Sequence, residues 1–142
     1  MGKKASAADG ELILKLYDLR REAVMRQARV DMVTKFVPKS WEEMSAVLKG
    51  DHPLNTAYRM VSSYWEMAAS MAKYGALHGE LLAANFGEGY INFAKVEPYL
   101  AEMRKTAPTA YVNTEWLVKS SKEAKVRYAL MQKRVAAMTA KA

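Results

Sequence analysis

The stretch DHPLNTAYRMVSSYWEMAASMAKY, residues 51–74, carries the clearest structural pattern in the chain. Its apolar side chains recur at three- and four-residue steps, which places them on one face of an α-helix; they are Leu54, Ala57, Tyr58, Val61, Tyr64, Trp65, Ala68, Met71 and Ala72. The opposite face holds Asn55, Arg59, Ser62, Ser63, Glu66, Ser70 and Lys73. Because an apolar face this rich in Tyr, Trp and Met needs other helices to cover it, we expect this segment to be the central helix of an all-α domain.

The composition is that of a single globular domain. The chain has 142 residues, of which 51% are hydrophobic and 26% are charged, and a domain of this length buries roughly 68 to 70% of the surface that its unfolded chain exposes. It contains no cysteine, which excludes disulfides, thiolate metal sites and cysteine nucleophiles. No apolar run is long enough to cross a membrane, and no secretory signal pattern opens the sequence. We therefore expect one helical domain over residues 1–142, in the cytoplasm, with frayed tails at 1–8 and 139–142.

Two long amphipathic segments flank the central one. The first begins near Ala8 or Asp9, with Asp9 as a candidate N-cap, and continues to about Lys35. It stops before Pro38, because a proline disfavours the helical conformation of the residue that precedes it. The second runs from about Asn113 to Met138. These two segments are expected to form the outer helices of the domain.

Shorter helices are expected between the long ones. Ser40-Trp41-Glu42-Glu43 is a capping box, in which the Ser40 hydroxyl and the Glu43 carboxylate each accept from the other residue's amide, and it predicts a helix from Trp41 to Lys49. Asp51-His52-Pro53 predicts the start of the central helix, and Gly75 is its expected C-cap.

The remaining segments are also helical in pattern. His78 to Phe86 predicts a short helix, closed by a flexible turn at Gly87-Glu88-Gly89, and Tyr90 to Lys105 predicts a helix bent at Glu97-Pro98. No alternation of apolar and polar residues predicts a strand. The sequence thus predicts a bundle of five to six helices, with two long outer helices and a central aromatic-rich helix.

A pattern of aromatic, glycine and proline positions covers the second half of the chain. It consists of Tyr64-Trp65-Glu66-Met67, Tyr74-Gly75-Ala76-Leu77, Gly87-Glu88, Phe93, Val96, Pro98-Tyr99-Leu100, Arg104 and Glu115-Trp116-Leu117. In this pattern the chain resembles a bacterial family of short helical proteins that is described only as a domain of unknown function. The resemblance implies the same order of helices and implies no activity, cofactor or catalytic residue.

The sequence has no pattern typical of a catalytic or metal site. The two histidines, His52 and His78, lie beside predicted helix ends, and neither has a second ligand at the i+3 or i+4 spacing of a metal-binding pair. The serines lack the strained turn of a hydrolase nucleophile, and the glycines are too far apart for a phosphate-binding loop. We expect no enzyme activity, no metal and no cofactor, and we interpret both histidines as capping or surface residues.

A set of polar residues interrupts the apolar face of the first long segment. Arg20, Gln27 and Asp31 are spaced so that they lie on one line along a helix. Buried charge is costly without a partner, and Arg59 and Glu66 of the central helix are candidates to complete the set. The alternatives are a structural polar network, exposure at the edge of the apolar face, or a small-molecule site formed by these five residues.

Positive charge is concentrated at the end of the chain. The formal net charge is +7, and residues 106–142 contain 7 basic and 2 acidic residues. A cationic helix face is typical of proteins that bind nucleic acid or another polyanion, and the candidates here are Lys119, Lys122, Lys125, Lys133 and Arg134. The alternative is a solvated helix surface without a partner.

The leading functional hypothesis is a non-enzymatic helical protein that acts through protein contacts, with a homodimer as one form. It is based on 10 methionines and 3 tryptophans, because methionine is common on surfaces that accept partners. The alternative is a monomer whose methionines fill the core. Polyanion binding through the basic last helix ranks second, and a small-molecule site at the polar set ranks third.

Overall fold

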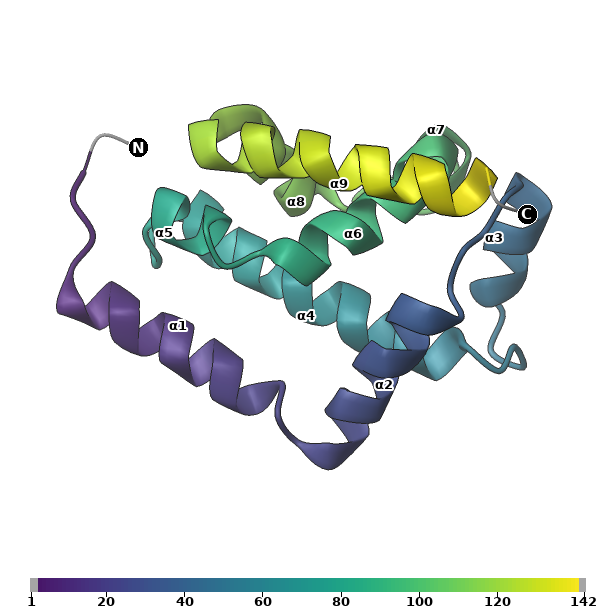
Figure 1. Ribbon diagram of the computed structural model, residues 1–142, viewed down its shortest axis with the longest axis horizontal. Helices are drawn as coiled ribbons and strands as arrows, with labels where there is room; N and C mark the ends of the chain where they lie inside the picture. Colours follow the sequence, from purple (N-terminus) through teal and green to yellow (C-terminus); the bar gives the residue numbers. More distant parts are fainter. Residues whose placement is uncertain (1–2, 141–142) are drawn as a thin grey trace.

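The computed structural model describes residues 3–140, and every regular element in that range is helical (Figure 1). The elements are α1 (Ala7–Leu19), α2 (Ala23–Thr34), α3 (Trp41–Val47), α4 (Asn55–Lys73), α5 (Gly79–Ala83), α6 (Gly87–Val96), the 3-10 helix η1 (Glu97–Tyr99), α7 (Leu100–Met103), α8 (Val112–Ser120) and α9 (Lys122–Ala140). The all-α prediction is confirmed. Within residues 3–140 the helices are shorter and more numerous than the five to six predicted.

The central helix is α4, as predicted. It packs against α2, α5, α6 and α8, and Figure 1 shows α1 and α2 on one side of it and α6 and α9 on the other. Its predicted apolar face is turned inward, with Ala57, Tyr58, Val61, Trp65, Ala68 and Ala72 buried. Asn55, which we assigned to the polar face, is buried as well, because its side-chain amide donates to the Val47 carbonyl (2.9 Å).

The single first helix predicted from Ala8 or Asp9 to Lys35 is wrong, because the chain forms two helices there. α1 ends at Leu19 and α2 begins at Ala23. The Glu22 carboxylate between them accepts hydrogen bonds from the amides of Val24 (3.0 Å) and Met25 (2.9 Å). This side chain satisfies the first free amides of α2 and so fixes a new helix start.

The N-cap of α1 also differs from the prediction. Ser6 is the N-cap and Asp9 is its partner in a capping box: the Ser6 hydroxyl accepts from the Asp9 amide (3.3 Å), and the Asp9 carboxylate accepts from the Ser6 amide (2.8 Å). Residues 7–8 are therefore helical, and at the other end α9 continues to Ala140. Of the expected tails, residues 1–2 and 141–142 lie outside the described residues.

The single last helix predicted from Asn113 to Met138 is likewise two helices. α8 ends at Ser120, and Ser121 has an extended backbone (φ −97°, ψ 129°). The Ser121 hydroxyl accepts from the Ala124 amide (3.0 Å), so it caps α9. Each of the two long outer helices that we predicted is thus a pair of shorter helices. In each pair, a residue between the two helices caps the second one: Glu22 caps α2 and Ser121 caps α9.

The predicted cap of α3 is half correct. The Ser40 hydroxyl accepts from the Glu43 amide (3.1 Å), but the Glu43 carboxylate accepts from the Lys39 amide (2.7 Å) instead of the Ser40 amide. The helix ends at Val47, before the predicted Lys49. The central helix starts at Asn55, later than predicted.

Gly75 and Gly89 have different structural roles. Gly75 has a positive φ of 82° after the end of α4, which confirms the predicted C-cap. Gly87-Glu88-Gly89, predicted as a flexible turn, is instead the first turn of α6. A Cβ atom at position 89 would lie 2.2 Å from the Phe86 ring, so the glycine is needed for close packing rather than for a turn.

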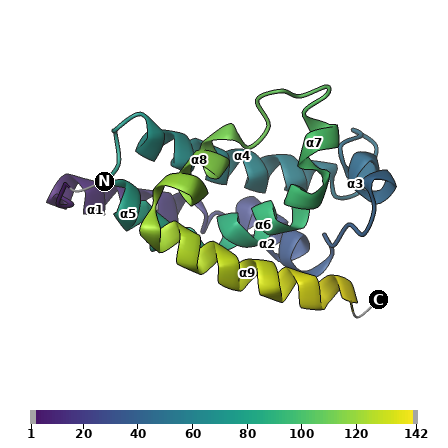
Figure 2. The same ribbon diagram turned by 90° about the horizontal axis from the view of Figure 1, so that it is seen from above.

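The bend predicted at Glu97-Pro98 is confirmed. α6 ends at Val96, the 3-10 helix η1 contains the proline, and α7 follows. The change of direction lets α6 pack along α9, as Figure 2 shows from above.

Aromatic rings connect the helices through the core. Trp65 of α4 contacts Phe86 with ring centroids 5.0 Å apart, and Phe86 contacts Tyr90 of α6 at 5.1 Å. Phe93 of α6 contacts Tyr128 of α9 at 5.3 Å and Tyr111 at 5.6 Å. Tilted and edge-to-face pairs of this kind stabilise a core beyond simple burial.

Most methionines lie in or against this core. Met25, Met32, Met44 and Met103 are buried, whereas Met67 is exposed. This supports the alternative in which methionine fills the core, and it removes the methionine argument for a partner surface. Apolar side chains are exposed elsewhere, including Leu14 and Tyr17 of α1 and Val126 and Leu130 of α9.

We predict that Trp65→Ala lowers the free energy of unfolding by about 3 to 5 kcal/mol, because it removes a buried ring and leaves a cavity. Trp65 is only 4% exposed. Urea denaturation would measure the change, with Tyr74→Ala as the control, since Tyr74 is 79% exposed. A loss below about 1 kcal/mol for Trp65→Ala would contradict the central role of this side chain.

Candidate functional site

The structure does not bring the five polar candidates together. The Gln27 amide donates to Asp31 (3.0 Å) on α2, and Asp31 also pairs with Lys35 (3.4 Å). Arg59 is exposed on α4. Glu66 bonds to the start of α8, and the Arg20 guanidinium lies against two aromatic rings.

Glu66 has a structural role. Its carboxylate accepts hydrogen bonds from the amides of Asn113 (2.8 Å) and Thr114 (2.9 Å) and from the Thr114 hydroxyl (2.7 Å). These groups lie at the N-terminus of α8, where amides lack partners within the helix and a negative charge is favourable. Glu66 therefore joins α4 to α8. Of the alternatives given for the polar candidates, a structural polar role is the one that applies to Glu66.

Glu80 caps α9 in the same way. Its carboxylate on α5 accepts from the amides of Lys122 and Glu123 (both 3.2 Å). Asp9 on α1 accepts from the His78 amide (2.9 Å), next to the start of α5. Several carboxylates of the chain are thus committed to helix starts on other elements.

Arg29 and Glu88 form an ion pair that sequence analysis missed. The Arg29 guanidinium donates from Nε to Oε1 (2.8 Å) and from Nη2 to Oε2 (2.6 Å) of Glu88, which is the bidentate geometry of a strong pair. Hydrogen bonding to Glu88 raises the pKa of Arg29. The Arg29 Nη1 also donates to the Arg20 carbonyl (3.3 Å). Arg29 lies on α2, after the break at residues 20–22, and its side chain reaches Glu88 on α6.

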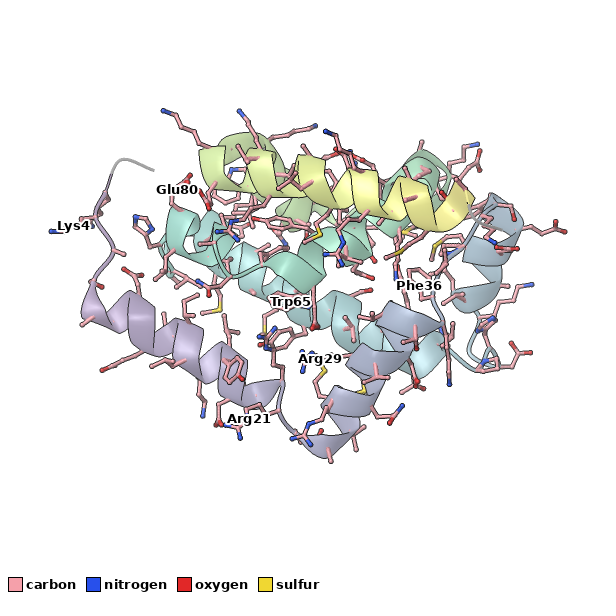
Figure 3. The ribbon with its side chains drawn as sticks, in the orientation of Figure 1. Lys4, Arg21, Arg29, Phe36, Trp65 and Glu80 are labelled. Atoms are coloured by element: carbon pink, nitrogen blue, oxygen red, sulfur yellow. The ribbon has the colours of Figure 1, made fainter. Side chains whose placement is uncertain are left out.

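A pocket of about 160 Å³ lies between α1, α4 and α5, and we call it the α1 pocket. It is lined by Ile13, Leu14, Leu16, Tyr17, Arg20, Tyr64, Trp65, Leu82 and Asn85. The Arg20 guanidinium carbon lies 4.9 Å from the centre of the Tyr17 ring and 5.7 Å from that of the Trp65 ring. Figure 3 labels Trp65 on α4, Arg29 on α2, and Arg21 in the turn between α1 and α2. Of the five polar candidates, Arg20 is thus part of this pocket.

A network of buried and partly buried polar side chains connects α4, α6 and the segment before α8. The hydroxyls of Tyr58 and Tyr111 are 2.8 Å apart, and the Tyr111 hydroxyl donates to Ser62 (3.0 Å). The Asn92 amide donates to Ser62 (3.1 Å). Burial raises the pKa of Tyr111 well above its usual value, so these hydroxyls are neutral hydrogen-bonding groups that hold the helices in register.

Lys95 is a buried cation without an acidic partner in the described part of the chain. Its side chain on α6 donates to the carbonyls of Met32 (2.8 Å) and Val33 (3.5 Å), at the C-terminus of α2. Lysine is favourable at this end of a helix, but burial lowers its pKa to about 8. This buried charge could not be predicted from the sequence, because Lys95 stands among the apolar residues Phe93, Ala94 and Val96 without a pattern that marks it as buried.

The basic candidates differ in their surroundings. Lys119 on α8 pairs with Glu115 (3.6 Å). Lys122, Lys125, Lys133 and Arg134 are exposed on α9 and form no ion pair with an acidic residue within residues 3–140. Val126 and Leu130 lie among them and are 65% and 56% exposed.

His78 is the N-cap of α5, as predicted for a capping residue, whereas His52 bonds within the turn before α4. The His52 Nδ1 accepts from the Leu54 amide (3.0 Å), and the His78 Nδ1 accepts from the Leu81 amide (3.1 Å). Across residues 3–140 no group of three or more His, Cys, Asp or Glu residues is arranged to hold a metal ion.

None of the helices in residues 3–140 is both long and apolar enough to cross a bilayer.

Comparison with known families gives one match. The family described as a domain of unknown function (DUF4760) matches residues 5–121. This range includes α1 to α8 and all residues that line the α1 pocket, and it ends just before α9. No curated protein and no solved structure matches the chain.

We predict a pH-dependent contribution of Lys95 to stability. Its pKa is about 8 in the folded protein and about 10.5 for an unperturbed lysine, so between these values the unfolded chain binds more protons and the free energy of unfolding rises with pH. Relative to Lys95→Met, the wild type should gain about 2 kcal/mol from pH 7.5 to pH 10, measured by urea denaturation. A difference between the two proteins that does not change with pH would contradict this.

Proposed function

This chain belongs to the DUF4760 family, a domain of unknown function, and we propose that it is a non-enzymatic cytoplasmic protein that binds another protein through α9. The observation that supports this is the outer face of α9. We call it the α9 face and define it as Val126, Leu130 and Ala137 with Lys122, Lys125, Lys133 and Arg134, all of which are exposed.

The spacing of these residues favours contact with a helix. Val126, Leu130, Lys133 and Ala137 follow one another at steps of four, three and four residues, so they lie along one line on the side opposite the buried Ala124, Tyr128 and Val135. An exposed aliphatic line of this kind is typical of surfaces that accept an amphipathic partner helix. In Figure 2, α9 forms one edge of the molecule, where a partner has access.

The charges on the α9 face favour an acidic partner. Within α9 there are five basic residues and one acidic residue, and that acid, Glu123, is paired with Arg127 (2.6 Å). Complementary charge guides association and selects between partners. A partner helix with leucine-type side chains flanked by Glu or Asp would contact both parts of the α9 face.

The carboxylates near the core support binding rather than catalysis. Glu66 and Glu80 accept backbone amides at helix starts, and Glu88 is held by Arg29. A general base must lie within hydrogen-bond reach of a substrate proton, and these three carboxylates are directed at groups of the protein itself.

Polyanion binding is the second candidate, because four basic residues of the α9 face form no ion pair with acidic residues of the described chain. Phosphate contacts would use these cations and leave Val126 and Leu130 without a role. The aliphatic pair therefore distinguishes the two candidates.

We predict that a synthetic 21-residue helical peptide, with leucine along one face and glutamate beside it, binds the protein through the α9 face. Val126→Ser combined with Leu130→Ser should weaken binding by about tenfold or more through lost apolar contact. Lys122→Glu combined with Lys133→Glu should weaken it at least as much. Fluorescence anisotropy of the labelled peptide would measure both effects.

The matched control is Lys15→Glu combined with Arg59→Glu, which changes the net charge equally at exposed positions away from α9 and should leave peptide affinity within about twofold. Duplex DNA serves as the second ligand. Tight DNA binding at physiological salt, with a slope of log affinity against log salt of about −3 to −4 and no response to the serine variants, would favour polyanion binding instead.

Self-association is the alternative to an acidic partner, and the charge of the α9 face disfavours it. Two α9 faces carry the same charge and repel each other, so we predict a monomer of 15.9 kDa by light scattering at micromolar concentration and low salt. A mass of twice this value would show that copies of the chain contact each other, and would replace the acidic partner by a homodimer.

A further inference from the structure

The Arg20 guanidinium is held in place without a hydrogen-bond partner. Its side chain is 23% exposed and lies against the rings of Tyr17 and Trp65. A guanidinium has five N–H donors, and within residues 3–140 none of those of Arg20 makes a hydrogen bond to a protein group. Donors that the protein leaves unused and that solvent can reach are available to a ligand.

The charge around Arg20 is not balanced. The carboxylate nearest to it is Glu88, with Nη1 and Oε2 4.0 Å apart, and Arg29 occupies both oxygens of Glu88 at 2.6 to 2.9 Å. Two guanidinium groups therefore share one carboxylate, and Arg21 lies close by, 6.0 Å from the centre of the Tyr17 ring. The Glu22 carboxylate of the same turn is bonded to the amides of Val24 and Met25, so it does not pair with Arg20.

The rest of the α1 pocket is apolar and aromatic. Ile13, Leu16 and Leu82 line it together with the rings of Tyr17, Tyr64 and Trp65. Its volume of about 160 Å³ is close to that of a cavity of roughly 150 Å³ that is known to accept benzene. Leu14 and Tyr17 are 69% and 51% exposed and form its rim, so the pocket is open to solvent.

Trp65 and Tyr64 also line the pocket, and their polar groups differ in their partners. The Trp65 Nε1 is buried and has no hydrogen-bond acceptor, although a buried indole N–H usually finds one. The Tyr64 hydroxyl, in contrast, donates to the Leu16 carbonyl and is already used. The site thus combines ring-sized apolar space with a partly exposed guanidinium that has no hydrogen-bond acceptor.

We propose that the α1 pocket binds a small aromatic carboxylate, with the ring among Tyr17, Tyr64 and Trp65 and the carboxylate on Arg20. The ring fits the volume and can stack or make edge contacts with the three aromatic side chains. The carboxylate forms a charge-assisted pair with a guanidinium that is already oriented by two rings. This binding site is separate from the α9 face and does not depend on the proposed function.

The test uses the full chain and three probes in a titration followed by two-dimensional NMR of the tryptophan indole N–H groups. Phenylacetate should bind with a dissociation constant of about 1 mM or tighter and shift the indole signal of Trp65, which Trp65→Phe identifies, more than those of Trp41 and Trp116. Phenylacetamide, which lacks the charge, and acetate, which lacks the ring, should each bind about tenfold more weakly or worse.

Two variants locate the carboxylate contact. Arg20→Gln should weaken phenylacetate binding about tenfold or more and leave phenylacetamide binding nearly unchanged, whereas Arg59→Gln, which removes an exposed arginine outside the pocket, should change neither. The proposal is overturned if phenylacetate leaves the Trp65 signal unmoved at 10 mM, about ten times the expected constant. Equal affinity for the acid and the amide, or equal losses in both arginine variants, would overturn it too.

Discussion

The Glu66 carboxylate on α4 accepts hydrogen bonds from two amides and a hydroxyl at the start of α8, and this contact joins the second half of the chain to the central helix. Without it, the first turn of α8 would have unpaired amides beside a partly buried surface, which costs more than the hydrogen bonds themselves contribute. The pairs Glu80 to α9 and Asp9 to the segment before α5 repeat the arrangement. The starts of α8 and α9 are thus each bonded by a carboxylate from another helix.

These contacts between helices bear on which parts of the fold could be predicted from the sequence. The face of α4 around Tyr58, Val61 and Trp65 follows from a spacing that only a helix satisfies, and the glycine after α4 and the proline in η1 act locally. The breaks at Glu22 and Ser121 interrupt an apolar spacing that continues across them, so periodicity alone predicts one helix where there are two. Contacts between distant residues, such as Arg29 with Glu88, leave no pattern in a single sequence.

The candidate sites were predictable to a similar extent. The cations of α9 were visible as a local excess of charge, and the structure adds that Val126 and Leu130 are exposed between them. The polar set of the first helix was a correct sign of something unusual but a wrong grouping, because the break at residues 20–22 separates Arg20 from Gln27 and Asp31. Of this polar set, only Arg20 lies at the α1 pocket, with its guanidinium against the Trp65 ring.

The attachment of α1 has a consequence for dynamics. This helix contributes one buried residue, Leu16, whereas α4 contributes eight, so local opening of α1 requires far less free energy than global unfolding. Its amides should exchange with solvent before those of α4, and the α1 pocket exists only while α1 is closed. A molecule bound in the pocket would therefore slow this exchange, because it stabilises the folded state of α1. Binding would in this way make the N-terminal surface of the protein more ordered.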